Sequence, residues 1–410
     1  MITGKADCGM LYAVRNSGSA VGYCSLSIGC GTRDEEGFHS GIAHFAEHTM
    51  FKGTDRKSAS TINSYLDKLG GELNAYTTKE EIVLHATVLK EDIRKASSLL
   101  LEIATNATFP EKQIETERGV VIDEISSSKD NPWEEVYDKF EEKLFAGHPL
   151  SRPILGTAES VSEISSDELR RFAAEKFRPE RMAFSLVAPV DEVKAEREIR
   201  KLAARFFPEN TTKSQIEKKP SFVRSEAPFD EKIDQGNHEA NAVMGGTAPS
   251  LYGERERLSA ILLSNILGGP ASNSILNETL RERHGWVYNV ECSYTQYADT
   301  GMMAVCLGCE KENVERCCAA VRKEILRLQM FPLSNTRLKA AKKQLLGQLA
   351  ITSDNGESQC LSMGKSLLSY GCVMPDSATR SQIEAITSSD LQAAASKIFA
   401  PDKICRLVYL

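Results

Sequence analysis

Two histidines and a glutamate lie close together in the segment GIAHFAEHTMFKGT, residues 41–54. His44 and His48 are four residues apart, so on a helix both imidazoles project from one face, one turn apart. Glu47 directly precedes His48, near enough to that face to reach a water molecule bound there. Because imidazole is a common metal ligand, the spacing predicts a metal site on this helix.

A zinc site with two histidines needs a third protein ligand and an open position for water. The segment EKQIETERGVVIDEISSSKD, residues 111–130, has the apolar spacing of a helix. Glu117 and Glu124 are seven residues apart on it, two turns along one face, so both can point at the same site. One would ligate the metal and the other would orient a histidine from behind, and the pattern alone does not choose between them. The alternative for either is a solvated helix surface.

The elements that must position these residues recur in the second half of the chain. VGYCSLSIGCGTR at 21–33 and NHEANAVMGGTAP at 237–249 both read as a strand that ends at glycine. In each half a helix, a second short helix, extended segments and a further helix follow in the same order, and the further helix begins near Lys90 or Lys311. This repetition predicts an α+β fold of two duplicated domains, each a mainly antiparallel sheet with helices packed on one face.

The two copies differ where the first carries its histidines and glutamate. The aligned positions of the second copy are Ala260, Leu263 and Ser264. Polar groups buried without partners are costly, so three of them on a helix whose duplicate is largely apolar favour a metal role for the first copy alone. A solvated or hydrogen-bonded histidine pair is the alternative.

We therefore predict an N-terminal zinc-binding domain at residues 1–210, a linker at 211–232 and a metal-free C-terminal domain at 233–410. The segment 208–232 is rich in charge and contains proline but few apolar residues, as is typical of a linker.

The composition excludes several classes of protein. The chain of 410 residues is 41% hydrophobic and 26% charged, which is typical of folded globular domains. A net charge of −7 argues against a general nucleic-acid binder, and no apolar stretch is long enough for a membrane span. Eleven scattered cysteines, Cys317 and Cys318 adjacent, favour free thiols in a reducing compartment. The expected location is the cytoplasm, or an organelle matrix or the periplasm if a leader has been removed.

Five segments of the chain form a recognisable series. They are HFAEHTMFKGT at 44–54, LGGELNAYTTKEE at 69–81, ERGVVIDEI at 117–125, HPLSRPILGT at 148–157 and LRERHGWVY at 280–288. The first of them carries H-x-x-E-H, the pattern of the inverzincins. Taken in order, the five segments resemble the insulinase (pitrilysin) family of zinc metallopeptidases, in the short-chain branch that includes the mitochondrial processing peptidase.

The resemblance implies a role for each matching residue. It makes His44, His48 and Glu124 the ligands of one zinc ion per chain, Glu117 the residue that supports a ligand, and Glu47 the general base. It implies further that Asn74, Ala75 and Tyr76 form an edge strand that pairs with the substrate backbone. Arg281 and Tyr288 match a pair that reaches the substrate carbonyl. The proline of Gly268-Gly269-Pro270 departs from the glycine run of the family's non-catalytic processing subunit.

The resemblance predicts a zinc metalloendopeptidase that hydrolyses unfolded peptides or presequences inside a chamber, with a zinc-bound water as nucleophile. Because the family encloses its site between four such domains and this chain supplies two, we expect a homodimer, or a heterodimer with a metal-free homologue. The alternatives are a non-catalytic core-type structural subunit, a zinc hydrolase that acts on another bond, and a maturase dedicated to one peptide. Nucleic-acid partners and membrane spans are not expected.

Overall fold

The structure is a computed structural model of the chain and describes residues 1–208, 222 and 227–410. Most of the predicted linker at 211–232 therefore lies outside the described residues. Its last three residues belong to a strand, Asp230–Ile233.

The chain divides into two compact units, and neither is continuous in sequence. The first unit comprises Met1–Ser126, Arg152–Ile216 and Ile351–Met374. The second comprises Ser127–Ser151, Glu217–Ala350 and Pro375–Leu410. These units differ from the domains predicted at 1–210 and 233–410, because one segment from each half of the sequence belongs to the unit built mainly by the other half.

The first unit contains a six-stranded sheet of order β1-β2-β6-β3-β5-β4. Its strands are β1 (Ile2–Lys5), β2 (Leu11–Asn16), β3 (Val21–Ile28), β4 (Glu72–Thr77), β5 (Ile82–Leu89) and β6 (Met182–Ala188). All neighbouring strands are antiparallel except the parallel pair β2 and β6. Its helices are α1 (Ile42–Met50), α2 (Ala59–Asp67), α3 (Ile93–Asn106), α4 (Glu111–Lys129), α6 (Ala158–Glu163), α7 (Ser166–Lys176), α8 (Glu192–Phe206) and α12 (Gly356–Tyr370).

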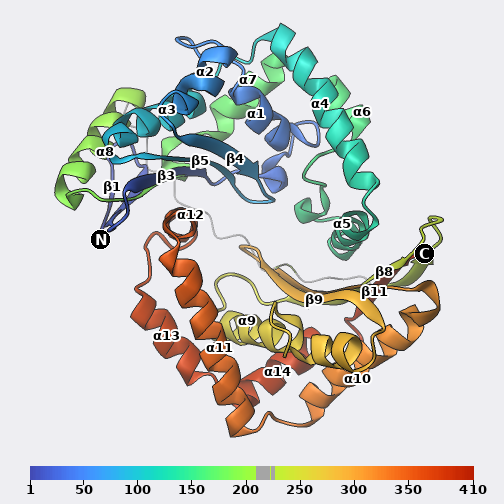
Figure 1. The fold of residues 1–410 in the computed structure, drawn as a ribbon. Helices are drawn as coiled ribbons and strands as arrows, with labels where there is room; N and C mark the ends of the chain where they lie inside the picture. Colours follow the sequence, from blue (N-terminus) through green and yellow to red (C-terminus); the bar gives the residue numbers. More distant parts are fainter. Residues whose placement is uncertain (209–221, 223–226) are drawn as a thin grey trace. The chain divides into compact units, whose positions relative to one another are not determined.

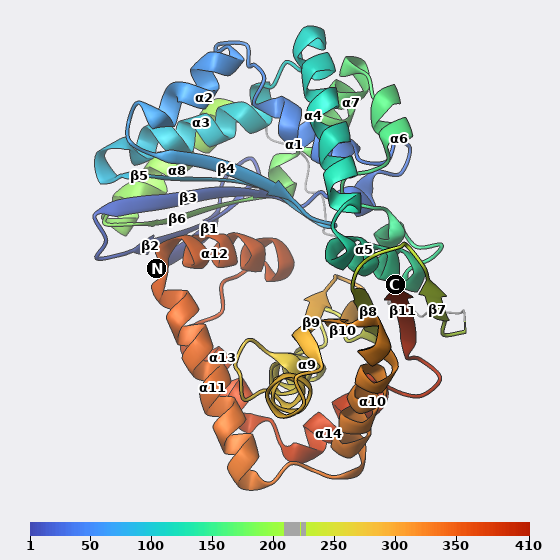
Figure 2. The ribbon, with the colours of Figure 1, turned by 45° about the vertical axis from the view of Figure 1, so that its right-hand side comes forward.

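Both faces of this sheet are covered, as the fully buried strand β6 illustrates. Phe184 and Leu186 enter the main core with α1 and α3, whereas Ala183 and Val187 pack against α12. This alternation follows from the period of two along a strand. Figure 2 shows α12 on the face of the sheet opposite α2 and α3.

The second unit contains a five-stranded sheet of order β7-β11-β8-β10-β9. Its strands are β7 (Asp230–Ile233), β8 (Ala240–Ala248), β9 (Val287–Gln296), β10 (Gly301–Cys309) and β11 (Cys405–Tyr409). Its helices are α5 (Pro132–Leu144), α9 (Glu254–Gly268), α10 (Val314–Met330), α11 (Asn335–Asp354), α13 (Asp376–Ala385) and α14 (Ser388–Ile398), with a π-helical turn at Asn277–Arg283. Helix α5 covers the face of this sheet opposite α9 and α14 (Figure 1).

The strand order confirms the predicted duplication. The run β2-β6-β3-β5-β4 has the same order and directions as β7-β11-β8-β10-β9, with a parallel first pair and antiparallel pairs thereafter. Helices α3 and α10 both follow a short 3₁₀ turn, at Lys90–Asp92 and Lys311–Asn313. The α+β fold is therefore confirmed. Helices were predicted on one face of each sheet, and the structure adds one helix on the other face, α12 in the first unit and α5 in the second.

Two expectations from composition can be compared with the structure. All eleven cysteines are free thiols, and Cys372 is the exposed one. No helix in the described part of the chain combines the length and the apolar character needed to cross a bilayer.

Candidate metal centre

The helix that carries His44, Glu47 and His48 begins at a glycine in the left-handed conformation. Gly41 has a φ of 88°, and a Cβ there would lie 2.7 Å from the carbonyl oxygen of Leu155 and 2.9 Å from Cα of Gly156. A glycine cannot cap the helix with a side chain, and the buried carboxyl group of Glu35 does so instead. It accepts hydrogen bonds from the backbone N–H groups of Gly41 at 3.1 Å and Ala43 at 3.0 Å. Burial raises the pKa of Glu35 to about 8.

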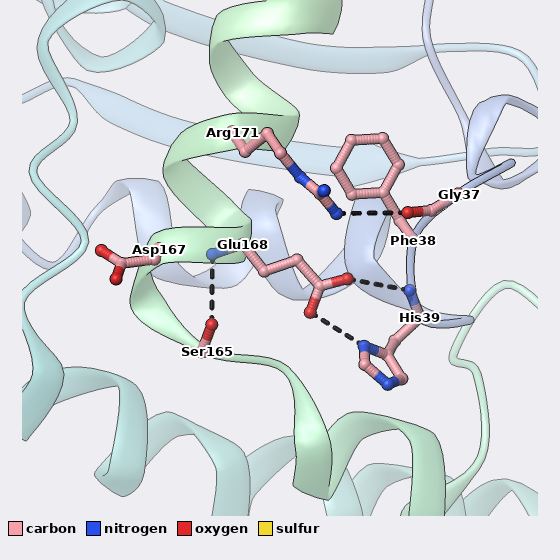
Figure 3. Close-up of a pocket in the computed structure, with 7 residues that line it drawn as sticks. All are labelled: Gly37, Phe38, His39, Ser165, Asp167, Glu168 and Arg171. Atoms are coloured by element: carbon pink, nitrogen blue, oxygen red, sulfur yellow. Dashed lines mark hydrogen bonds and ion pairs between the residues drawn. The ribbon is translucent and has the colours of Figure 1, made fainter.

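The segment between Glu35 and α1 is held by helix α7, around a surface pocket shown in Figure 3. Glu168 accepts from the backbone N–H of His39 at 3.0 Å and lies 2.8 Å from its ring Nδ1. Arg171 donates to the carbonyl of Gly37 at 3.2 Å and stacks over the ring of Phe38. The hydrogen bonds to Glu168 raise the pKa of His39. These contacts fix the entry to α1 and include none of the predicted site residues.

Helix α1 divides its residues between the core and the site. Ile42, Phe45, Ala46 and Met50 are fully buried in the main core. The imidazoles of His44 and His48 share another face, with ring centroids 4.5 Å apart. The predicted projection of both rings from one face is therefore seen in the structure.

Helix α4 brings Glu124 to these rings. Its Oε2 atom lies 3.7 Å from Nε2 of His44 and 3.5 Å from Nε2 of His48. One potential ligand atom from each of the three residues lies within 4.8 Å of the other two.

Glu117 takes a different position, behind His48. Its Oε1 atom lies 3.1 Å from Nδ1 of His48, and its Oε2 atom lies 2.7 Å from Nζ of Lys52. The sequence left open which glutamate ligates the metal. The arrangement favours Glu124 as the ligand and Glu117 as the residue that orients His48.

The donor set fits a divalent cation such as zinc. Oε2 of Glu124 is buried and has no hydrogen-bond partner among the described residues, although it faces two ring nitrogens. Burial, followed by the neighbouring His48, lowers the pKa of His44 to about 3, so its ring is neutral near pH 7, the form that binds metals. Two imidazoles and one carboxylate are a ligand set of catalytic zinc sites.

Glu47 extends from α1 toward the end of β4. Its Oε2 atom accepts a hydrogen bond from the Thr77 hydroxyl at 3.3 Å. Burial raises the pKa of Glu47, while His48 and the Thr77 hydroxyl oppose that shift. A carboxyl group whose pKa is shifted toward neutrality suits general acid–base chemistry.

The predicted substrate strand lies at an edge of the first sheet. Strand β4 pairs with β5 and is the last strand in the sheet order. Asn74, Ala75 and Tyr76 precede Thr77 on this strand, so they lead directly to the residue that contacts Glu47.

Arg281 and Tyr288 belong to the second unit, whereas the three potential ligands and Glu47 belong to the first. Arg281 lies in the π-helical turn Asn277–Arg283, and Tyr288 lies near the start of the edge strand β9. The Tyr288 side chain is exposed, and its hydroxyl donates to Glu310, which raises the pKa of Tyr288 to about 12.

Three residues that support the site were not predicted from the sequence, namely Glu35, Lys52 and Thr77. Lys52 follows His48 by four residues, a spacing that could have suggested a shared helix face. Glu35 has no comparable signal, because it reaches α1 through a loop.

Comparison with known proteins identifies similar families and chains. Residues 11–158 match the family model of the insulinases (peptidase family M16), and residues 163–345 match the model of the peptidase M16 inactive domain. A Streptomyces coelicolor protein named as an uncharacterized zinc protease is 30% identical over 375 residues, which cover 90% of this chain and 80% of the relative. A Bacillus subtilis protein named in the same way is 27% identical over 383 residues, covering 93% and 91%.

Solved structures share the fold. A protease from Helicobacter pylori matches with a TM-score of 0.90 at 16% identity, covering 100% of this chain and 98% of its own. A peptidase M16 inactive domain from Pseudomonas fluorescens matches with a TM-score of 0.87 at 20% identity, covering 100% and 97%. The shared fold is consistent with the assignment that the family models and the zinc proteases above establish: the chain belongs to the insulinase family of zinc metallopeptidases, peptidase family M16, in its short-chain form.

Proposed function

We propose that this chain is a zinc-dependent metalloendopeptidase that cleaves unfolded peptides or presequences. The observation that carries the proposal is the convergence of His44, His48 and Glu124, with the carboxylate of Glu47 on the same helix. A bound zinc ion would supply Lewis-acid activation of a water molecule and of the substrate carbonyl.

The residues of the chain supply the remaining chemistry. Glu47 takes the proton of the attacking water and passes it to the leaving amine, as a general base and then a general acid. Thr77 holds the Glu47 carboxylate through its hydroxyl. Glu117 accepts the Nδ1 proton of His48, which leaves Nε2 of that ring free to face the metal beside Glu124.

Substrate binding follows from the unpaired side of β4. An extended peptide can add to such an edge through main-chain hydrogen bonds, with Asn74, Ala75 and Tyr76 as its partners. Main-chain recognition tolerates many sequences but requires an extended segment, which favours unfolded substrates. Because Thr77 continues this strand to Glu47, a peptide bound along β4 passes close to the general base.

We further propose that two chains enclose a chamber, with Arg281 and Tyr288 as donors to the substrate carbonyl at the metal centre. The family resemblance supports this assembly. For Tyr288 to act in this way, its hydroxyl must exchange Glu310 for the substrate. Size-exclusion chromatography with light scattering should give the mass of a dimer, and full activity of a strict monomer would contradict the chamber.

The test of the function compares zinc content and hydrolysis of a quenched unstructured peptide in the wild type and Glu47→Gln. Both proteins should hold about one zinc ion per chain, while Glu47→Gln should lose about 10²–10⁴-fold in rate. Glu102→Gln serves as a matched control, because Glu102 is a buried carboxylate of the same unit whose partners are Lys57 and Thr54.

Each outcome of this test has a consequence. Zinc bound by both proteins with activity in the wild type alone establishes a zinc peptidase with Glu47 as its base. Substantial activity in zinc-loaded Glu47→Gln would contradict the assignment of Glu47 as the general base. Zinc bound without any cleavage by the wild type points to a missing partner subunit or to a maturase for one peptide, and protein without zinc favours a structural subunit.

A further inference from the structure

One carboxyl group in the first unit bridges a lysine and a histidine that is one of the proposed ligands. The Oε2 atom of Glu117 lies 2.7 Å from Nζ of Lys52, and its Oε1 atom lies 3.1 Å from Nδ1 of His48. The two oxygens therefore have separate partners. A displacement of the ammonium would release one oxygen and let the carboxylate rotate away from the ring.

The backbone and the surroundings of Lys52 keep its side chain beside Glu117. Helix α1 ends at Met50, and the backbone N–H of Lys52 donates to the carbonyl of Thr49 at 3.0 Å, which fixes the start of its side chain. Lys52 follows the C-terminal end of the helix by two residues, and a positive charge is favourable near such an end because of the helix dipole. The exposed fractions of the Lys52 and Glu117 side chains are 21% and 11%, so solvent screens this pair less than a pair on the open surface.

We propose that Lys52 is a positioning residue of the metal centre, acting through Glu117 on His48. The ammonium fixes the Glu117 carboxylate, the carboxylate accepts the Nδ1 proton of His48, and Nε2 of the ring is left as an acceptor directed toward Glu124. The inference rests on the proposed function, because it gives Lys52 a role only if His48 binds a metal.

The first unit contains a matched pair that serves as a control. Lys57 Nζ lies 2.5 Å from Oε2 of Glu102, with exposed fractions of 19% and 5% for the two side chains. Glu102 also accepts from the hydroxyl of Thr54, and this pair includes none of the proposed ligands. A general loss of stability from removing a half-buried lysine should therefore appear equally in Lys57→Met.

The experiment measures the zinc affinity of the metal-free protein by competition with a chromophoric chelator, with Zn²⁺ alone as the probe. Lys52→Met should weaken zinc binding about 10–100-fold, as is usual when a residue that orients a ligand is lost. Lys52→Arg should recover most of this loss because it keeps the cation. Lys57→Met should bind zinc like the wild type, even if its unfolding midpoint falls.

A second readout does not depend on zinc. Nitrogen chemical shifts of ¹⁵N-labelled histidines in the metal-free protein should show His48 protonated at Nδ1 in the wild type and mixed between both nitrogens in Lys52→Met. The His48 signal is assigned by its absence in His48→Ala. If Lys52→Met does not fold, Lys52→Gln takes its place in both measurements.

The failures of the two proposals are distinguishable. Wild-type zinc affinity and an unchanged His48 tautomer in Lys52→Met, with zinc binding lost in His48→Ala, would overturn the role of Lys52 and leave the metal centre standing. An equal loss of affinity in Lys57→Met would also overturn it, since the effect would then be one of stability. A wild type that binds no zinc would overturn the proposed function and this inference with it.

Discussion

Helices α1 and α9 occupy the same place in the two duplicated halves and differ in what they carry. Where α1 has His44, Glu47 and His48, α9 has Ala260, Leu263 and Ser264, all of them buried. Both helices follow the matching strands β3 and β8. The duplicated scaffold therefore does not by itself supply a set of metal-binding side chains, because the two helices differ at all three of these positions.

The partner helices extend the comparison. In the first unit α4 brings the carboxylates of Glu117 and Glu124 to the histidines of α1. In the second unit α11 brings the amide of Gln348 to α9, where it accepts from the side chain of Asn265 at 2.6 Å. A neutral amide pair thus joins one pair of helices, and an assembly of carboxylates and imidazoles joins the other.

The largest expected effect comes from making α1 resemble α9 through the combined substitutions His44→Ala, Glu47→Leu and His48→Ser. Because these residues supply two proposed ligands and the base, zinc binding and peptide hydrolysis should both fall to background. The unfolding temperature should not fall greatly, because α9 folds with the same residue types at these positions. Metal analysis, peptide hydrolysis and thermal unfolding check the result, and a protein that no longer folds would show that the two scaffolds are not equivalent.

The two helices also differ in the backbone conformation of the glycine at which each begins. Gly41 has a φ of 88° and backbone atoms of residues 155 and 156 close to its missing Cβ. Gly253, which precedes α9, has a φ of −79°, and the atom nearest its missing Cβ belongs to the side chain of Glu256. Gly41→Ala should therefore lower the free energy of unfolding by about 1–3 kcal/mol, and Gly253→Ala by much less. Equal effects in chemical denaturation would contradict this difference.

The Glu35 cap of α1 should make the stability of the protein depend on pH. In the described part of the chain, the N-cap residue of α9, Gly253, has no such hydrogen bond with a side chain. Burial raises the pKa of Glu35 from its ordinary 4.5 to about 8, so between these values the folded protein keeps a proton that the unfolded chain releases. The contribution of Glu35 to stability therefore falls as pH rises through this window, by at most about 1.4 kcal/mol per pH unit. In Glu35→Gln this dependence is absent. The stability of the wild type relative to Glu35→Gln should decrease from pH 5 to pH 8, and a constant difference would contradict the shift.

The smallest expected effect concerns the ends of the two edge strands. Thr77, the last residue of β4, donates to Glu47, whereas Gln296, the last residue of β9, accepts from Arg257 at 3.4 Å. Loss of the Thr77 hydrogen bond should raise the pKa of Glu47 further, because that bond opposes the effect of burial. Thr77→Val should move the acidic limb of kcat/KM to higher pH, with about a fivefold loss of rate for a bond worth about 1 kcal/mol. Gln296→Met is the control, and identical pH profiles for wild type and Thr77→Val would exclude the effect.

The parts of the candidate site that lie on a single helix could be predicted from the sequence. The four-residue spacing of His44 and His48 fixes a shared helix face wherever the helix lies, and the seven-residue spacing of Glu117 and Glu124 does the same. The choice between the two glutamates could not be made this way, because it depends on how α4 lies against α1. The contact of Lys52 with Glu117 depends on the same packing.

For the fold as well, the repeated order of elements could be predicted, whereas the packing of distant segments could not. Repeated element order revealed two duplicated halves, and the strand order confirms them. The sequence did not predict that α5 belongs to the second unit and α12 to the first. An apolar stripe such as Val136, Phe140 and Leu144 shows that one face of a helix is buried, but it does not show which sheet covers that face. A hydrophobic pattern identifies a buried face of one segment, whereas the packing of α5 or α12 depends on a second segment far away in the sequence.

The position of α12 in the first unit also has a consequence for synthesis of the chain. A ribosome releases β3 and β6 long before residues 356–370, so the sheet face that receives Met363 and Leu367 stays bare in the meantime. At about 5–20 residues per second this interval lasts on the order of ten seconds, and exposed apolar surface of this kind is prone to aggregation. The first unit therefore reaches its complete form only after residues 356–370 have been translated.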